Sequence, residues 1–524
     1  MAGQHIAIIG AGISGLLACK YILSKGFNPI VFESRDQVGG VWTKTIQTTK
    51  LQTPKSLYQF SDFPWPSSVA ENFPTQKQVL EYIQSYAHHH DLLKYIKFNS
   101  RVLSLSYDGP SDEEMGKWTL WGGTGEPFGP KGKWNVSVQD TRTLRTEVHR
   151  VDFVIVCAGM YSDFPNIPEF PPEKGPEAFQ GKVMHSMEYS SMDHASAAKL
   201  IQGKRVAVVG FQKSGMDISM ECSSANGTPS VCSFAAWNFV LLSLITLRLL
   251  QASSNHVLYY TEQNTGICLI TLHGEFLWGI SIKIGSPGSW FISLRWGISK
   301  FVESHIRKKL RLAKHGMVPN HSFLKEVNSC SVATVPEGFF DRVDQGSIVL
   351  KKARRFSFCS EGVMVDGETE PLEIDLLILA TGFRGVDKLK AAFSSPAFRD
   401  LMDKEDTRLP LYRTCIHPRI PQLAFIGFSE SIANLFTSEM TCRWLAELLG
   451  GTFKLPSIKE MEKDVSQWDK YMKQSMGEYY SRYCLDALQI WYNDQLCKDM
   501  GWKPQRKKGL FRELFEPYRP MDYA

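Results

Sequence analysis

The sequence lacks the patterns that would indicate several other kinds of protein. Its eleven cysteines include no Cys-x-x-Cys pair, which counts against a disulfide reductase. An odd number of scattered cysteines predicts a reduced chain rather than a disulfide scaffold. No Ser/His/Asp or Cys/His arrangement and no metal-spaced cluster is visible. The sequence therefore predicts no metal site and no side-chain nucleophile.

Dense charge and long apolar runs are also missing. The net charge of +5 is spread thinly, with short basic runs at 307–309 and 506–508, so a nucleic-acid partner is not expected. Residues 2–9 lead directly into a strand, which predicts no signal peptide and a cytoplasmic location. One nearly apolar stretch, 234–252, contains Arg248 and falls short of the roughly 20 apolar residues of a membrane span. We therefore predict no membrane anchor.

The stretch HIAIIGAGISGLLACKYILSKGFNPIVFES (5–34) carries the strongest positive signal. A short apolar strand leads into Gly-x-Gly-x-x-Gly, then a helix, then a second strand that ends in an acidic residue. The glycines permit a tight turn and close backbone approach to a pyrophosphate, which the helix N-terminus attracts. The acid stands at the position expected to bind a ribose hydroxyl. This predicts a dinucleotide site made by Gly10, Ala11, Gly12, Ile13, Ser14, Gly15 and Glu33.

The residues after this unit distinguish between dinucleotides. Glu33 would repel a 2′-phosphate, which leaves FAD and NAD. The following segment, SRDQVGGVWTKT, places Gly40, Val41 and Trp42 shortly beyond the acid. A Gly-Gly-x-Trp loop at this position resembles flavoproteins of this fold, so we expect FAD at the first loop.

A second glycine loop follows at VAVVGFQKSGMD (206–217). Gly210 and Gly215 occupy the outer positions, but Gln212 replaces the middle glycine. A side chain there moves a phosphate outward, and Lys213 and Ser214 could supply a charge and a hydroxyl in exchange. Similar strand segments at 151–156 and 376–379 bracket this loop, which predicts an inserted domain at about 166–335.

Several motifs together resemble those of the flavin-containing monooxygenases, in particular the plant branch of this class B flavoprotein family. FQGKVMHSMEY (179–189) matches Phe-x-Gly-x-x-x-His-x-x-x-Tyr, and its final Tyr189 argues against the related Baeyer–Villiger enzymes. FSDFPWP (60–66), ATGF (380–383) and SEMTCRWLAELL (438–449) also resemble the family. The resemblance implies two Rossmann-like α/β domains: FAD binding in 1–165, to which Val102 contributes, NADPH binding in 166–335, and a return to the flavin side with C-terminal helices in 336–524.

The resemblance also implies the chemistry. NADPH reduces FAD, the reduced flavin adds O2 at C4a, and the hydroperoxide oxygenates an amine nitrogen or a thioether sulfur of a small molecule. The cofactor carries this chemistry, while the protein positions it and excludes water. Gln52, followed by Thr53, stands where the family often has an asparagine facing the oxygenated flavin. His185 is interpreted as organising the domain linker rather than transferring protons.

Residues 234–293 depart from the resemblance. The family's basic residue after the second-loop strand is missing, because no Lys or Arg follows Cys232 until Arg248. Two explanations fit: an altered exon or translated intron in the gene model, or a genuine divergent insertion lining the substrate mouth. The departure also leaves an alternative function open, a flavin-binding protein without turnover because its NADPH domain is disrupted.

Overall fold

The structure is a computed structural model of the 524-residue chain. It describes residues 3–129, 132–226, 231–235, 241–242, 289–323, 325, 330, 333–353, 355–402, 409–431, 433–477, 484–485, 488–509 and 518–523. Most of the atypical segment, including 243–288, therefore lies outside the described residues, as does the end of the nearly apolar stretch.

The first unit is built on a five-stranded parallel sheet in the order β18-β7-β1-β2-β3. Its central strands are short and almost wholly apolar, as strands covered on both faces must be. Four strands come from the N-terminal part and one returns from near the C-terminus: β1 (His5–Ile9), β2 (Asn28–Phe32), β3 (Ile96–Lys97), β7 (Phe153–Val156) and β18 (Leu423–Phe425).

The second unit repeats this plan with a parallel sheet in the order β13-β10-β9-β17-β8. Numbered along the chain from the strand before its glycine loop, the first sheet reads 3-2-1-4-5. The second sheet reads 3-2-1-4 in the same way, and β8, which precedes β9 in the chain, takes the fifth position. The strands are β8 (Lys182–His185), β9 (Val206–Val209), β10 (Val231–Ala235), β13 (Ile348–Lys352) and β17 (Leu376–Leu379). The predicted fold, two Rossmann-like units with the smaller inserted in the larger, is confirmed.

Each unit also carries a three-stranded antiparallel sheet between its third and fourth parallel strands. In the first unit these strands are β4 (Ser100–Asp108), β5 (Lys133–Asp140) and β6 (Thr146–Val151). In the second they are β14 (Phe356–Cys359), β15 (Gly362–Val365) and β16 (Leu372–Glu373). A short pair, β11 (Leu241–Leu242) and β12 (Ala333–Thr334), lies apart from both.

This repetition changes the predicted boundary at residue 335. The segments 151–156 and 376–379 resemble each other because each supplies the fourth strand of its own sheet, not because both flank an insertion. Strands β13 and β17 pair within the second sheet although they follow residue 335. We therefore place the end of the inserted unit after β17, where Pro165 and Phe383 bridge the outgoing and returning linkers.

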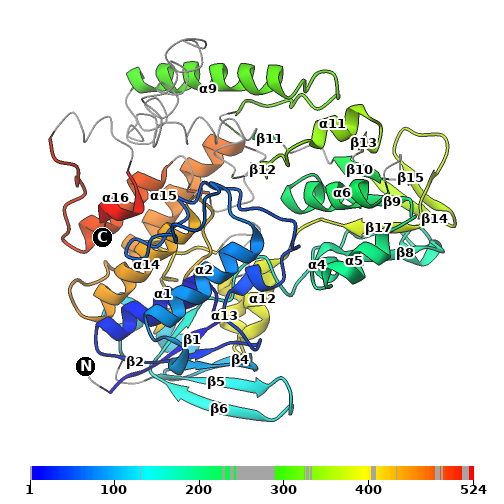
Figure 1. Cartoon of the computed structure of the whole chain (residues 1–524). Coiled ribbons are helices and arrows are strands. Elements are labelled where there is room, and N and C mark those ends of the chain that lie inside the picture. The colour runs from blue at the N-terminus through cyan, green and yellow to red at the C-terminus, as the bar shows by residue number, and fades with distance from the viewer. Residues whose placement is uncertain are drawn as a thin grey trace.

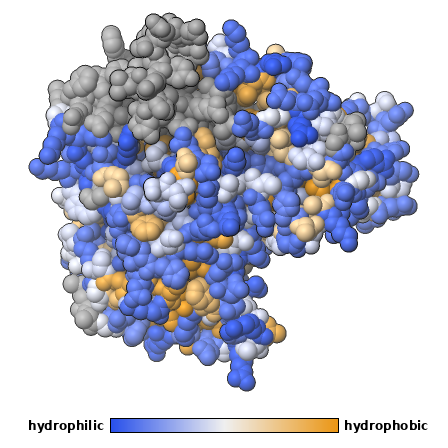
Figure 2. Space-filling model, in the orientation of Figure 1, coloured by the Kyte–Doolittle hydropathy of each residue, from blue (hydrophilic) through white to orange (hydrophobic). Residues whose placement is uncertain are grey.

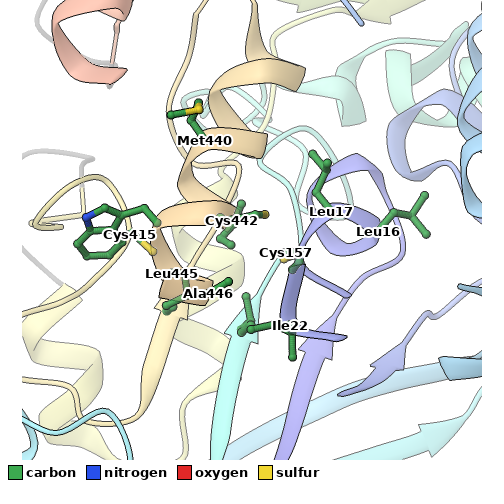
Figure 3. Packing of buried hydrophobic residues seen from close by; sticks show 14 of the residues in the cluster. Leu16, Leu17, Ile22, Cys157, Cys415, Met440, Cys442, Leu445 and Ala446 are labelled. Carbon is green, nitrogen blue, oxygen red and sulfur yellow. The ribbon is translucent and has the colours of Figure 1, made fainter. Parts of the chain in front are cut away.

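Helices cover the sheets and extend beyond them at the C-terminus (Figure 1). In the first unit, α1 packs against α14, with Cys157 at the end of β7 beside them (Figure 3). Burial raises the pKa of the Cys157, Cys415 and Cys442 thiols in this core, so they behave as inert apolar groups. The helices are α1 (Ile13–Ser24), α2 (Gln76–His89), α3 (Asp112–Gly116), α4 (Ser186–Ser190), α5 (His194–Ile201), α6 (Lys213–Asn226), α9 (Ser289–Lys309), α11 (Phe339–Asp344), α12 (Gly385–Ala392), α13 (Pro396–Met402), α14 (Asn434–Leu449), α15 (Ile458–Met476) and α16 (Gln489–Asp499).

Two of the motifs seen in the sequence meet through one buried carboxylate. Glu439 of α14 is fully buried and accepts hydrogen bonds from Ser61, through its backbone nitrogen at 3.0 Å and its hydroxyl at 2.5 Å. It also accepts from the Tyr21 hydroxyl at 2.6 Å and from Arg443 Nη2 at 2.9 Å. The Phe-Ser-Asp-Phe-Pro-Trp-Pro segment and the start of α14 are therefore held together against α1.

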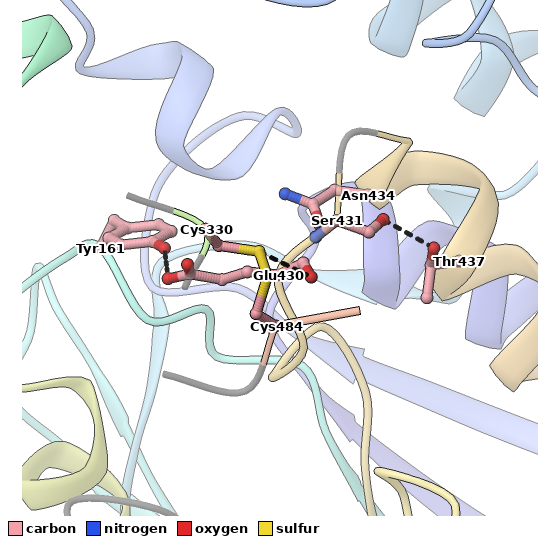
Figure 4. Close-up of a disulfide and its surroundings, with 7 residues drawn as sticks. All are labelled: Tyr161, Cys330, Glu430, Ser431, Asn434, Thr437 and Cys484. Carbon is pink, nitrogen blue, oxygen red and sulfur yellow. Dashed lines mark hydrogen bonds between the residues drawn. A yellow bond between two sulfur atoms is a disulfide. The ribbon is translucent and has the colours of Figure 1, made fainter. Parts of the chain in front are cut away.

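The expectation of a fully reduced chain is wrong at one pair. Cys330 and Cys484, 154 residues apart, form a disulfide with a Cα–Cα distance of 5.4 Å (Figure 4). Both lie at Glu430, whose backbone oxygen is 3.4 Å from Cys330 Sγ, and the Tyr161 hydroxyl donates to the Glu430 carboxylate. Only the fold brings these cysteines together, because neither belongs to a local pairing motif.

The face seen in Figure 2 is mainly hydrophilic, with several apolar patches, the broadest of them in the lower part of the view. Within the part of the chain that the structure describes, no helix combines the length and the apolar character needed to cross a membrane. Among those same residues, no group of three or more His, Cys, Asp or Glu side chains is placed to hold a metal ion.

Candidate cofactor and substrate site

The first glycine loop has the crowded geometry that requires glycine. Gly10 has φ +99°, and a Cβ there would lie 2.7 Å from the Cys157 carbonyl oxygen. A Cβ on Gly15 would lie 1.8 Å from the Gly10 carbonyl oxygen, so helix α1 can approach strand β1 only with glycine at this position. Ala11 is fully buried behind the turn.

The N-terminus of α1 is open to an anion. Gly12 caps the helix without a side-chain hydrogen bond, and no acidic residue lies in the first turn, which includes Ile13 and Ser14. The unsatisfied N–H groups and the positive end of the helix dipole are thus available to a pyrophosphate. The backbone of Gly40 approaches the loop from the other side: a Cβ on Gly12 would lie 3.4 Å from Gly40 Cα.

Glu33 is placed to connect the loop with a ribose. The side chain is only 6% exposed, and its two oxygens accept hydrogen bonds from Ala11 N at 2.7 Å and Arg35 N at 2.9 Å. Oε1 also accepts from the Ser34 hydroxyl at 3.3 Å, so Oε2 is the oxygen that keeps a lone pair for a further donor. A carboxylate oxygen in this position can accept a hydrogen bond from a ribose hydroxyl.

The Gly-Gly-x-Trp loop forms a short 3₁₀-helix, η1 (Gly40–Thr43). Arg35 Nη1 holds the Gly40 carbonyl at 2.6 Å, and the Trp42 indole donates to the Tyr58 hydroxyl at 2.9 Å. Val41 is 47% exposed, so its side chain is available to a ligand. Val102 lies near the start of β4, paired with Val138 and half-buried.

The second glycine loop has the same backbone plan. Gly210 has φ +125°, and a Cβ on Gly215 would lie 2.2 Å from the Gly210 carbonyl oxygen. The Gln212 carbonyl accepts the first helical bond, from Met216 N at 3.0 Å, as the Gly12 carbonyl does from Leu16 N. Gln212 therefore occupies the position of Gly12. The backbone that packs against position 12 is that of Gly40, which belongs to the first unit.

Lys213 does not have the free charge that the sequence suggested. Its ammonium bonds both carboxylate oxygens of Asp217, one turn further along α6. Asp217 offsets this positive charge, so Lys213 adds little net attraction for a phosphate. Ser214 is exposed on the first turn of the helix, where its hydroxyl remains accessible.

Gln52 and Thr53 lie where the two units meet. The Gln52 side-chain oxygen accepts from Thr334 N at 3.0 Å, and its backbone oxygen accepts from the Thr334 hydroxyl at 3.3 Å. Because a backbone N–H can only donate, this bond fixes which end of the amide is oxygen. Thr53 follows directly and is half-buried.

His185 has a structural environment. It is 1% exposed, caps helix α4 by accepting from Met187 N at 3.1 Å, and lies 5.3 Å from the Phe383 ring, measured between ring centres. Burial lowers its pKa, so the imidazole is neutral and holds the linker at 380–385. This position agrees with the interpretation of His185 as an organiser of the domain linker.

A cavity of about 750 Å³ opens between the two units. Its walls come from 46–51 and 71–73 of the first unit, from α5 and α6 of the second, and from 334–337. Leu51 and Thr334 line it, which places the cavity next to Gln52. This volume lies within the range of small-molecule sites, which often form at domain interfaces.

The sequence reasoning missed the polar contacts that join the units at this cavity. Thr49 donates to Asp217 at 2.6 Å, Thr48 donates to Glu221 at 2.5 Å, and Tyr189 donates to Glu221 at 2.7 Å. One feature of the sequence could have indicated these contacts. Asp217 and Glu221 are four residues apart in α6, a spacing that places both carboxylates on one face of the helix.

The family model described as flavin-binding monooxygenase-like matches residues 3–241 and 294–514. The chain belongs to this family. The match omits 242–293, which falls within the segment that the sequence analysis singled out as atypical.

Similar proteins agree with this assignment. The chain is 39% identical to "Probable flavin-containing monooxygenase 1" of Arabidopsis thaliana, over 100% of this chain and 96% of that protein. It is 27% identical to flavin-containing monooxygenase 5 of Oryctolagus cuniculus, over 100% and 89%. Among solved structures, OTEMO in complex with FAD and NADP has a TM-score of 0.65 at 16% identity, covering 95% of this chain and 98% of that one. S-allyl-L-cysteine S-oxygenase from Allium sativum has a TM-score of 0.57 at 17% identity, covering 95% and 89%.

The family assignment confirms the predicted class of enzyme, a flavin-dependent monooxygenase with FAD and NADPH as cofactors. It implies O2 and a small-molecule substrate. The plant-branch resemblance is also confirmed, at 38–39% identity to two Arabidopsis thaliana proteins.

Proposed function

We propose that this monooxygenase oxygenates a soft nucleophilic nitrogen or sulfur atom of a small molecule, an amine or a thioether. The observation that carries the proposal is the pair of glycine loops, each opening a helix, together with a cavity between the two units. Lys213 of the second loop lines this cavity, as do Leu51 and Thr334, the neighbours of Gln52. Bound FAD supplies the redox chemistry, taking hydride from NADPH and activating O2 as its C4a-hydroperoxide.

The first loop and its surroundings suit FAD in shape and charge. The α1 N-terminus would hold the pyrophosphate, Glu33 a ribose hydroxyl, and the backbone at 40–42 the flavin side. The second loop would hold the NADPH pyrophosphate at the α6 N-terminus through Gly210, Gln212, Lys213, Ser214 and Gly215. The side chain of Gln212 and the pairing of Lys213 with Asp217 favour a looser phosphate site than the first.

The alternative of a disrupted NADPH domain is disfavoured by the second sheet. Strand β10 pairs along its length with β9 on one side and with β13 on the other. The parallel sheet beneath the second glycine loop is thus continuous up to the start of the atypical segment. This sheet supports the second glycine loop in the same way that β1 and β2 support the first glycine loop.

Anaerobic titration of the purified yellow protein with NADPH tests this function. We expect the flavin absorbance to bleach, and air to restore it with oxygen transfer to an added tertiary amine or thioether. Flavin that stays oxidised in excess NADPH would contradict the proposal and favour the alternative without turnover. Bleaching without any oxygenated product would contradict the substrate class.

We propose that the side-chain amide nitrogen of Gln52 donates a hydrogen bond at the site of oxygen transfer. The side-chain oxygen is engaged by Thr334 N, so the NH2 group is the end that can donate toward the flavin. Gln52→Glu keeps an acceptor for Thr334 N and loses this donor. We expect flavin reduction by NADPH to be preserved, while product formed per turnover falls on the order of 100-fold, as when one preorganised donor is removed.

The measurement for Gln52 is product against hydrogen peroxide at fixed NADPH consumption. Thr334→Val is the matched control, because it removes only the bond from the hydroxyl to the Gln52 backbone and keeps the N–H donor. Equal product yields in Gln52→Glu and the unmodified enzyme would rule out a role for the amide.

A further inference from the structure

Helix α6 is tied to the first unit by two carboxylates on one face. Asp217 and Glu221 lie four residues apart, and each accepts a hydrogen bond from one of two consecutive threonines, Thr49 at 2.6 Å and Thr48 at 2.5 Å. Asp217 is 5% exposed and Thr49 7% exposed, so this bond is sheltered from water. A sheltered charge-assisted hydrogen bond is among the stronger polar contacts.

Each acid is held in place from its own unit. Lys213 neutralises Asp217 from the first turn of α6. The Tyr189 hydroxyl donates to Glu221 at 2.7 Å, and burial followed by the neighbouring Glu221 raises the pKa of Tyr189, so its hydroxyl stays a donor. The last residue of the Phe-x-Gly-x-x-x-His-x-x-x-Tyr pattern thus orients an acid that reaches the other unit.

The threonines lie on the loop that leads to Gln52. Thr49 O accepts from Gln76 N at 2.9 Å and Leu51 N donates to Pro74 O at 2.8 Å, which fix the loop on the first unit. Three residues after Thr49, Gln52 contacts Thr334. The helix that begins at the second glycine loop is therefore connected to the flavin-side loop within one short stretch of chain.

From these contacts we infer that Asp217 and Glu221, through Thr49 and Thr48, are positioning residues that set the second glycine loop against the flavin side for hydride transfer. The inference rests on the proposed NADPH function of that loop. A misplacement of about 1 Å between reacting groups costs on the order of 100-fold in rate, so the interfacial bonds at Asp217 and Glu221 of this helix have a measurable effect.

The test is Thr48→Val/Thr49→Val in the FAD-loaded full chain. Valine keeps the shape of threonine and removes only the hydroxyl. We expect NADPH to reduce the flavin on the order of 10- to 100-fold more slowly in anaerobic stopped flow, with dithionite reduction and FAD content unchanged. Thr452→Val is the matched control: the Thr452 hydroxyl also donates to a carboxylate, Glu447 at 2.5 Å, but at the C-terminal end of α14, so its loss is expected to leave the rate unchanged.

Hydrogen–deuterium exchange without NADPH gives a readout independent of turnover. We expect faster exchange at 46–52 and 213–226 in the double variant and in Glu221→Gln, which weakens the contact from the second unit's side. Unchanged exchange, or an unchanged reduction rate, in both variants would overturn the inference. If NADPH fails to reduce even the unmodified flavin, the proposed function fails, and exchange alone then decides whether the threonines hold α6.

Discussion

Gly15→Ala is expected to give a protein that loses flavin during purification, whereas Gly215→Ala gives a yellow protein that needs far more NADPH for flavin reduction. The alanine Cβ would meet backbone oxygen at 1.8 Å in the first case and 2.2 Å in the second. Neither oxygen can move aside as a flexible side chain would, so each substitution displaces the helix N-terminus that binds phosphate. We expect each to weaken its own dinucleotide on the order of 100-fold, or about 3 kcal/mol.

The measurements are the FAD-to-protein ratio and the NADPH concentration that gives half-maximal flavin reduction. Gly116→Ala serves as the control, because a Cβ there meets no atom within 4 Å and its φ is not positive. Full flavin content in Gly15→Ala, or normal reduction of Gly215→Ala by NADPH, would contradict the assignment of the corresponding loop.

Glu439→Ala is expected to destabilise the first unit by about 3–5 kcal/mol, as when one partner of a buried ion pair is removed. The substitution leaves Arg443, 11% exposed, without its carboxylate, and removes the acceptor of Ser61 N and the Tyr21 hydroxyl. It also separates the 60–66 segment from α14, which packs on α1 behind the first glycine loop.

Urea unfolding followed by flavin release measures this effect. Glu447→Ala provides the comparison on the same helix, since Glu447 pairs with Lys25 at 2.7 Å where the side chains are 16% and 30% exposed. An exposed pair contributes about 0–1 kcal/mol, so the two variants differ severalfold. A loss in Glu439→Ala no larger than in Glu447→Ala would show that the buried network does not hold these segments together.

The sequence determined what depends on short stretches of chain. Each glycine loop with its flanking strand and helix is a local unit, because the tight turn, the close helix approach and the free N–H groups all arise within about fifteen residues. Loop, helix and strand at 5–34 and 206–226 could therefore be recognised directly. The atypical segment was recognised for the same reason, because it departs from a local sequence pattern. Its residues 242–293 also lie outside the family match.

The tertiary structure alone decided what depends on distant partners. The backbone of Gly40 packs against Gly12, with a Cβ at position 12 placed 3.4 Å from Gly40 Cα, and this neighbour comes from a separate loop of the first unit. Strands β7 and β17 look alike in sequence, but only their pairing shows that each is the fourth strand of a separate sheet. The Cys330–Cys484 bond and the contacts of Thr48 and Thr49 with α6 join residues more than 150 positions apart. No local pattern encodes such contacts, because they form only when distant parts of the chain meet in the fold.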